Sequence, residues 1–169
     1  MRPSKPAAKE PPRPPRAAST PTRATPAPKP ARPSPAESAL LALSRTLTAL
    51  DRPENSARVT VTTALDVLAI AFQPGASLPR ALAQARNAAL ADEARALAIA
   101  WAREQLRLSL GEIFERAASA GALKPMLPVD SLAWLVLAAC EALADEHPHA
   151  APDRLRLVAD WLTGTPTGD

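Results

Sequence analysis

Apolar residues recur with the 3.6-residue period of an α-helix along most of this chain. The pattern begins with the leucines at 40, 43, 47 and 50 and ends near residue 162. No second β-like segment is present that could pair with a strand. The pattern predicts an all-α domain of about six helices over 36–164, with helices at 35–50, 57–72, 78–90, 92–120, 130–146 and 153–163.

Local signals mark several of the helix ends. Ser34-Pro35-Ala36-Glu37 combines an N-cap serine, a proline at the first helical position and a glutamate at the third. Ser77 is expected to cap the third helix and Asp92 to open the fourth. Gly121 is placed to end the fourth helix as a left-handed residue.

One segment leaves its secondary structure open. Val59 to Thr63 is β-branched and alternating, which taken alone favours a strand. A helix over 57–72 instead places Val61, Leu65, Leu68 and Phe72 on one face. Because no partner strand exists, we interpret this segment as a helix.

The longest helix carries two apolar stripes. Ile99, Leu106, Leu110, Ile113 and Ala117 follow one side along its length. A second stripe on the opposite side is confined to the N-terminal half and contains Leu97, Trp101 and Leu108. Burial of both stripes would place this helix in the middle of a bundle.

The helix predicted over 130–146 is apolar nearly all the way round. From Leu132 to Cys140 no side chain is polar except the thiol. Such a helix needs burial on every side, and a small domain has little core to surround it. The surplus face therefore indicates a second copy of the chain, although burial inside a monomer is the alternative. The predicted interface residues are Leu132, Leu135, Val136, Ala139 and Leu143, with Trp134, Leu137, Ala138 and Cys140 over much of the remaining surface.

Charge separates the chain into two parts. Residues 1–35 hold 12 of the 20 prolines, eight Lys/Arg and one acid, for a formal charge of +7, whereas residues 36–169 sum to −4. We expect residues 1–35 and 165–169 to be disordered. The basic tail could bind phosphates non-specifically, dock its Pro-x-x-Pro elements in an aromatic groove, or act only as a linker. The cations that would contact nucleic acid are Lys5, Lys9, Arg13, Arg16, Arg23, Lys29 and Arg32.

Nothing in the sequence forms a catalytic constellation. It contains no phosphate-binding glycine loop, no Cys/His metal spacing and no nucleophile elbow, so we expect no enzyme activity, no cofactor and no metal. His147 and His149 flank a helix-breaking proline, and Glu112 and Glu115 suit a solvated face. Cys140 is expected to be a small buried hydrophobe. The N-terminus resembles no signal peptide and the longest apolar run is too short for a membrane span, which favours a cytoplasmic protein.

Four features follow one another over 92–164: a long helix ending in Ala120-Gly121-Ala122-Leu123, a Pro/Asp turn over 125–130, a helix starting Leu132-Ala133-Trp134-Leu135, and a short final helix. In this order they resemble the regulatory domain of tetracycline-repressor (TetR) family regulators. The resemblance implies that the last two helices pair with their copies in a second subunit, which adds Leu155, Val158 and Leu162 to the predicted dimer interface. It also implies a largely apolar ligand cavity, for which Leu68, Phe72, Trp101 and Phe114 are candidates against the alternative of ordinary core packing.

The DNA-binding head of that family has no counterpart here. No glycine precedes Gly75, no tyrosine occurs, and three helices do not fit before residue 50. We therefore expect a homodimeric, non-enzymatic regulatory domain without its own helix-turn-helix, acting in transcriptional regulation through a small apolar ligand or a partner. The alternative is a nucleic-acid-associated accessory protein whose basic tail binds phosphates.

Overall fold

A computed structural model describes residues 32–52, 54–144, 154 and 157–158 of the chain. These residues form helices and loops without a strand, so the all-α prediction is confirmed and the segment over 57–72 is a helix. Of the predicted sixth helix, Arg154, Leu157 and Val158 are helical, and its other residues lie outside the described ranges. Of the segments predicted to be disordered, 1–31 and 165–169 lie outside the described ranges. Residues 32–35 are described: Ser34 caps α1 and Pro35 is its first residue, so the predicted tail extended too far. The helices are α1 (Pro35–Leu50), α2 (Ala57–Phe72), α3 (Ser77–Ala89), α4 (Glu93–Ser119) and α5 (Val129–Leu143).

The helix ends follow the local sequence in most places. The Ser34 hydroxyl accepts a hydrogen bond from the Glu37 N–H, and the Glu37 carboxylate accepts one from the Ser34 N–H, which completes a capping box. Asp92 caps α4 by accepting from the Arg95 N–H. Ser77 is not the cap of α3: Ala76 occupies that position and Ser77 is the first helical residue. The backbone turns into α3 at Ala76, one residue earlier than the serine signal indicated.

The turn after α4 is a Schellman motif. Gly121 has φ +69°, a left-handed conformation that favours glycine. Its N–H donates to the Ala118 carbonyl, and the Ala122 N–H donates to the Ala117 carbonyl. Leu123, just beyond the turn, is buried. This motif ends the longest helix sharply and allows α5 to fold back alongside it.

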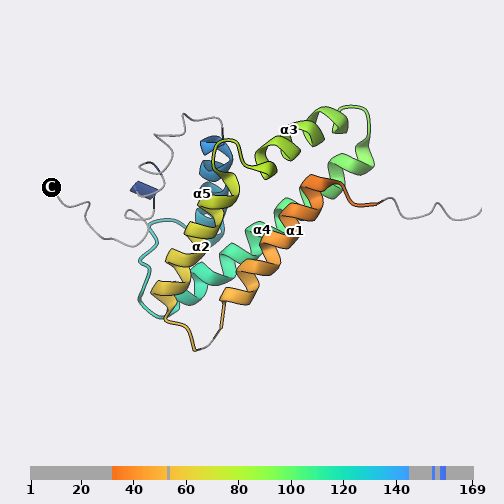
Figure 1. Cartoon of the computed structure of the whole chain (residues 1–169). Coiled ribbons are helices and arrows are strands. Elements are labelled where there is room, and N and C mark those ends of the chain that lie inside the picture. Colours follow the sequence, from red (N-terminus) through yellow and green to blue (C-terminus); the bar gives the residue numbers. More distant parts are fainter. Residues whose placement is uncertain (1–31, 53, 145–153, 155–156, 159–169) are drawn as a thin grey trace, which may run out of the picture. The chain divides into compact units, whose positions relative to one another are not determined.

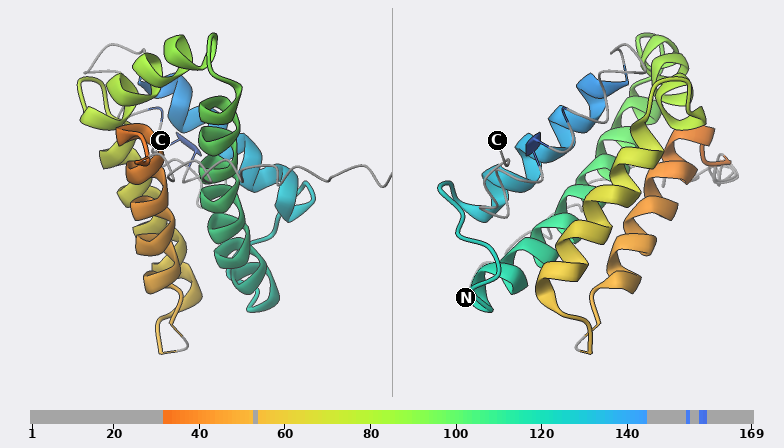
Figure 2. Two further views of the ribbon diagram at one scale, coloured as in Figure 1. Left: turned by 90° about the vertical axis from the view of Figure 1, so that its right-hand side faces the viewer. Right: turned by 60° about the vertical axis from the view of Figure 1, so that its left-hand side comes forward.

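Helix α4 is the central element of the described chain (Figure 1). It contacts each of the other four helices, most extensively α1. Contacts between residues 44 and 109 and between residues 51 and 116 show that α1 and α4 run parallel, whereas pairing of residue 103 with 141 and 107 with 130 makes α5 antiparallel to α4. The views in Figure 2 show α1 and α5 on different sides of α4, with α3 crossing one end of the bundle.

The core is apolar and continuous across the five helices. Its largest fully buried side chains include Phe72, Phe114, Leu68 and Leu106. Of the first predicted stripe on α4, Leu106, Leu110, Ile113 and Ala117 are buried, and Ile99 is partly buried against the core.

The second stripe on α4 does not have the burial that the sequence predicted. Leu97 is 71% exposed, Trp101 54% and Leu108 44%. The other described helices pack around the inner side and flanks of α4, so the side opposite Leu106 and Ile113 has no helix over it. Helix α4 is therefore central in its contacts but buried on one side only.

Candidate interaction surface

The inner face of α5 belongs to the core of its own chain. Leu132, Val136 and Leu143, which the sequence predicted at a dimer interface, are nearly or fully buried, as are Leu137 and Cys140. Side chains enclosed in this way leave no surface for a second subunit. Ala139 is partly buried, and Leu135 alone of the predicted α5 interface residues is exposed, at 40%.

The outer face of α5 carries the apolar surface that remains. Ser131, Leu135, Ala138 and Ala142 follow the three- and four-residue spacing that puts them on one side of a helix, and each is exposed or partly exposed. Trp134, 49% exposed, lies beside this row. The row contains no charged side chain, and three of its four members are small enough to let another helix approach closely. We call Ser131, Trp134, Leu135, Ala138 and Ala142 the outer α5 face.

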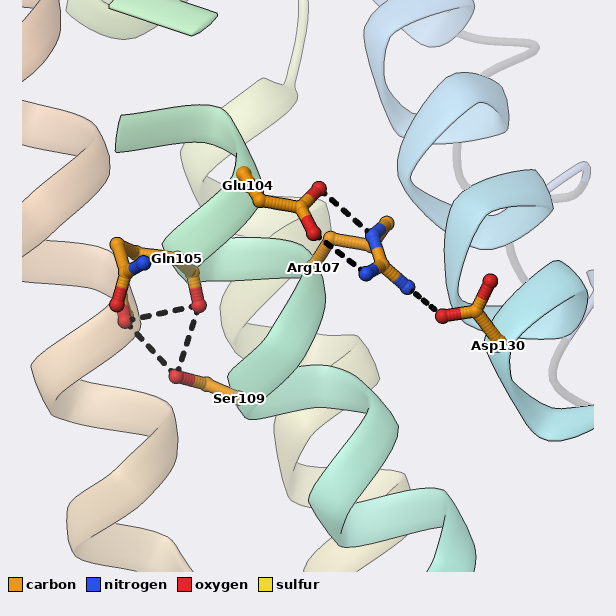
Figure 3. A network of polar contacts seen from close by, with 6 residues as sticks. Glu104, Gln105, Arg107, Ser109 and Asp130 are labelled. Carbon is orange, nitrogen blue, oxygen red and sulfur yellow. Dashed lines mark hydrogen bonds and ion pairs between the residues drawn. The ribbon is translucent and has the colours of Figure 1, made fainter. Parts of the chain in front are cut away.

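Arginines of α4 neutralise the acids that border this face. Arg103 Nε lies 2.7 Å from Glu141 Oε1, and Arg86 of α3 reaches the other oxygen of the same carboxylate at 3.3 Å. At the start of α5, Arg107 pairs with Asp130, and it also pairs with Glu104 one turn back on α4 (Figure 3). Both acids of α5 are thus engaged toward α3 or α4 rather than left as free charges beside the outer α5 face.

The Glu104–Arg107 contact changes the proton affinity of both groups. The hydrogen bond from the Arg107 guanidinium holds the pKa of Glu104 below its ordinary value, against the opposing effect of burial. The same bond, with that to Asp130, raises the pKa of Arg107. Arg107 remains a cation at every accessible pH, so the seam between α4 and α5 keeps its charge pairing in neutral solution.

The outward side of α4 is apolar in part but acidic along its length. The exposed Leu97, Trp101 and Leu108 share this side with four exposed glutamates. These glutamates are Glu93, Glu104, Glu112 and Glu115, and the solvated positions predicted for the last two are confirmed. We call Leu97, Trp101, Leu108 and these four glutamates the outer α4 face.

The candidate ligand residues lie in the core or on the surface of the described structure. Leu68, Phe72 and Phe114 are fully buried in the continuous core, and Trp101 lies on the outer α4 face. The burial of the three core residues agrees with the core packing that was the alternative at the sequence level, and the ligand role stays a prediction. A pocket does exist among the described residues, but it lies between the start of α1, α3 and the start of α4.

A polar seam between α1 and α4 was not visible in the sequence. The hydroxyls of Ser44 and Ser109 are buried and 2.8 Å apart, and Ser44 also donates to the Gln105 carbonyl at 3.2 Å (Figure 3). Thr48 Oγ1 lies 3.3 Å from Ser109 Oγ. Each serine by itself suits a helix surface, so only the parallel packing of α1 on α4 brings these hydroxyls together.

Cys140 is a buried thiol, as predicted. It is 1% exposed, and burial raises its pKa to about 12, with a smaller contribution from the Glu141 charge. A thiol in this state is a poor nucleophile because the reactive thiolate is scarce at neutral pH.

The remaining predicted site residues are only partly described. Val158 packs, half-buried, against the core, whereas Leu155 and Leu162 lie outside the described residues. Of the tail cations only Arg32 is described, and it lines the pocket beside α1. His147 and His149 also fall outside, and the described residues contain no cluster of three potential metal ligands.

Comparison with known proteins adds no relative. The chain matches no protein-family model, no curated protein and no solved structure. Among the described residues, no single helix is long and apolar enough to span a membrane. Helices α2 and α3, which meet at a bend of 62°, reach that length and apolarity only when they are taken together.

Proposed function

We propose that this chain is a homodimeric, non-enzymatic helical regulatory domain that pairs through the outer α5 face. The observation that carries the proposal is the combination of exposure and missing charge on that face. Leu135 and Trp134 are 40% and 49% exposed, and the small residues beside them are uncharged. Apolar patches left on a folded chain mark interfaces more often than they mark plain surface.

The symmetry of a homodimer suits a face of this kind. In a two-fold interface the same patch meets itself, so an unbalanced charge near the axis would face its own copy. The outer α5 face avoids this because Asp130 and Glu141 are paired with arginines of the same chain. Serine and alanine at 131, 138 and 142 would let the two copies of α5 approach closely around Leu135.

The regulatory role rests on the resemblance to TetR-type domains. The Schellman turn at Gly121, the proline-containing loop and the returning apolar helix occur in the order expected from that resemblance. In such domains the last two helices form the dimer, and here α5 is the described member of that pair. A helical domain that dimerises in this way would act in transcriptional control by sensing a ligand or by binding another protein.

Light scattering on the full chain tests the dimer directly. We expect a mass near twice the 17.7 kDa of the chain at micromolar concentration. Leu135→Glu should yield the monomer with unchanged helical circular dichroism, because Leu135 is exposed within its own chain. A wild-type protein that is already monomeric at these concentrations would refute the proposal.

A second candidate function is supported by the charge separation along the chain. Residues 1–35 carry +7 and the rest −4, so phosphate binding would belong to the tail while the helical domain joins two tails. A gel-shift titration separates the candidates. Complete loss of DNA binding on deletion of 1–31, together with a steep salt dependence in the intact chain, favours the accessory role; binding that survives the deletion excludes it.

A further inference from the structure

The pocket at the start of α1 has the features of a small-molecule site. It has a volume of about 390 Å³ and is bounded by the segment entering α1, by α3 and by the start of α4. This volume is within the range of about 300–1,000 Å³ that small-molecule sites occupy. The lining residues are Arg32, Pro33, Ser34, Pro35, Ala81, Gln84, Ala85, Ala88 and Arg95.

Small apolar residues form much of the pocket surface. Ala81, Ala85 and Ala88 recur at four- and three-residue spacing on α3, and Pro33 and Pro35 face them from the other wall. Alanine leaves open volume where a larger residue would fill it. The capping box at Ser34 fixes the proline wall, since both hydrogen bonds of that box hold the chain as it enters α1.

The polar side chains that line the pocket are two guanidinium groups, one amide and the Ser34 hydroxyl, which accepts the Glu37 N–H. Arg32 belongs to the segment before α1 and Arg95 to the first turn of α4, and Gln84 of α3 supplies the amide. No carboxylate lines the pocket. Asp92, the N-cap of α4, accepts a hydrogen bond from the Arg95 N–H and also lies 3.8 Å from Arg95 Nε. Glu37 accepts the Ser34 N–H. Planar guanidinium groups bind carboxylates through two parallel hydrogen bonds.

We propose that this pocket binds a small amphipathic carboxylate, with the carboxylate between Arg32 and Arg95 and the apolar body against the alanines of α3. This inference is independent of the proposed dimer, because the pocket lies within one chain and shares no residue with the outer α5 face. It places a ligand site away from the core residues Leu68, Phe72 and Phe114.

Methyl NMR on the full chain, titrated with straight-chain carboxylates from butanoate to dodecanoate, tests the proposal. We expect saturable shifts of the Ala81, Ala85 and Ala88 methyl signals. Octylammonium, which has a similar apolar body and the opposite charge, should cause none. If no member of the series shifts these signals at millimolar concentration, or if octylammonium shifts them equally, the proposal is wrong.

A matched pair of double variants separates the site from general charge attraction. Arg32→Gln with Arg95→Gln should weaken carboxylate binding at least about tenfold, as expected for loss of charge-assisted hydrogen bonds. Arg45→Gln with Arg80→Gln removes the same charge from exposed positions outside the pocket and should change the affinity less than about twofold. Equal weakening by both pairs would overturn the assignment of this pocket. Ala88→Trp should fill the pocket and abolish the methyl shifts without altering the oligomeric state.

Discussion

The outer faces of α4 and α5 look alike in composition but differ in charge. Each presents an exposed tryptophan and exposed leucine to the surroundings: Trp101 with Leu97 and Leu108 on α4, and Trp134 with Leu135 on α5. On α4 these residues share the face with Glu93, Glu112 and Glu115, which form no ion pair with a described residue, and with Glu104, which Arg107 neutralises. The row on α5 has no glutamate. Because the proposed interface uses only the α5 face, it rests on missing charge and not on apolar exposure alone. The useful signal is apolar exposure where charge is missing or already neutralised within the chain.

The inner faces of the two helices provide the reference for this comparison, and their substitution should have the largest effect. Phe114 of α4 and Leu137 of α5 are both fully buried. Phe114→Ala should reduce the free energy of unfolding by roughly 3–5 kcal/mol and Leu137→Ala by roughly 2–5 kcal/mol, through lost burial and cavity formation. Urea denaturation with an unchanged m-value measures both. A cost below about 1 kcal/mol at either site would contradict the core described here.

The buried thiol of α5 should make the folding stability of the chain depend on pH. Folding raises the pKa of Cys140 from an ordinary value of 9.0 to about 12. The unfolded thiol therefore ionises first, so the stabilisation is complete below pH 9, decreases as pH rises, and is lost as pH passes through 12. The upper bound of the effect is about 4 kcal/mol, from about 1.4 kcal/mol per unit of pKa difference.

Urea denaturation from pH 8 to pH 10.5 measures this dependence, and the chain simplifies it because it contains no tyrosine. Cys140→Ala is the control and should flatten the curve. A native thiol that reacts with Ellman's reagent as fast as the urea-unfolded chain would contradict the burial. Equal pH slopes in the wild type and Cys140→Ala would contradict the pKa shift.

The ion pairs between α4 and α5 should have a smaller effect. Glu141 contacts Arg103 and Arg86 and is 17% exposed. Glu141→Gln should cost about 1 kcal/mol of folding stability, and less in high salt, since partly exposed ion pairs contribute little. Glu112, on the outer α4 face, forms no ion pair with a described residue, so Glu112→Gln is the matched control, with an expected change within about 0.5 kcal/mol. Equal effects of the two substitutions would mean that the ion pairs of Glu141 contribute no specific folding stability.

The outer α4 face should tolerate substitution best. Trp101→Ala should change the free energy of unfolding by less than about 0.5 kcal/mol and leave the oligomeric state unchanged, because the side chain is 54% exposed and has acids around it. Thermal denaturation and light scattering check both parts. A shift from dimer to monomer would reassign the interface to α4 and reverse the comparison.

The helices and their ends could be predicted from the sequence because they depend on local signals. The capping box at Ser34, the cap at Asp92 and the left-handed Gly121 each use residues within a few positions of one another. The helical interpretation of 57–72 was correct because the absence of a partner strand outweighs β-propensity.

The distribution of burial could not be predicted in the same way. Periodicity shows that Leu97 and Leu132 each lie on an apolar stripe, but not which stripe receives a neighbouring helix. The chain buries Leu132 and exposes Leu97. A count of glutamates along the second α4 stripe would have indicated its exposure. Three features depend on which helices meet, and the sequence contains no local signal for that. They are the pocket between α1, α3 and α4, the Ser44–Ser109 contact, and the Arg103–Glu141 ion pair between α4 and α5.

The most direct test of the proposed interface is to place the same charge on each outer face and measure self-association. Leu135→Glu and Leu108→Glu introduce one glutamate at positions that are 40% and 44% exposed, so their effects on folding should match. Sedimentation equilibrium should show a dimer for Leu108→Glu, as for the wild type, and a monomer for Leu135→Glu. A Leu135→Glu protein that dimerises as tightly as Leu108→Glu would contradict the assignment of the interface to α5.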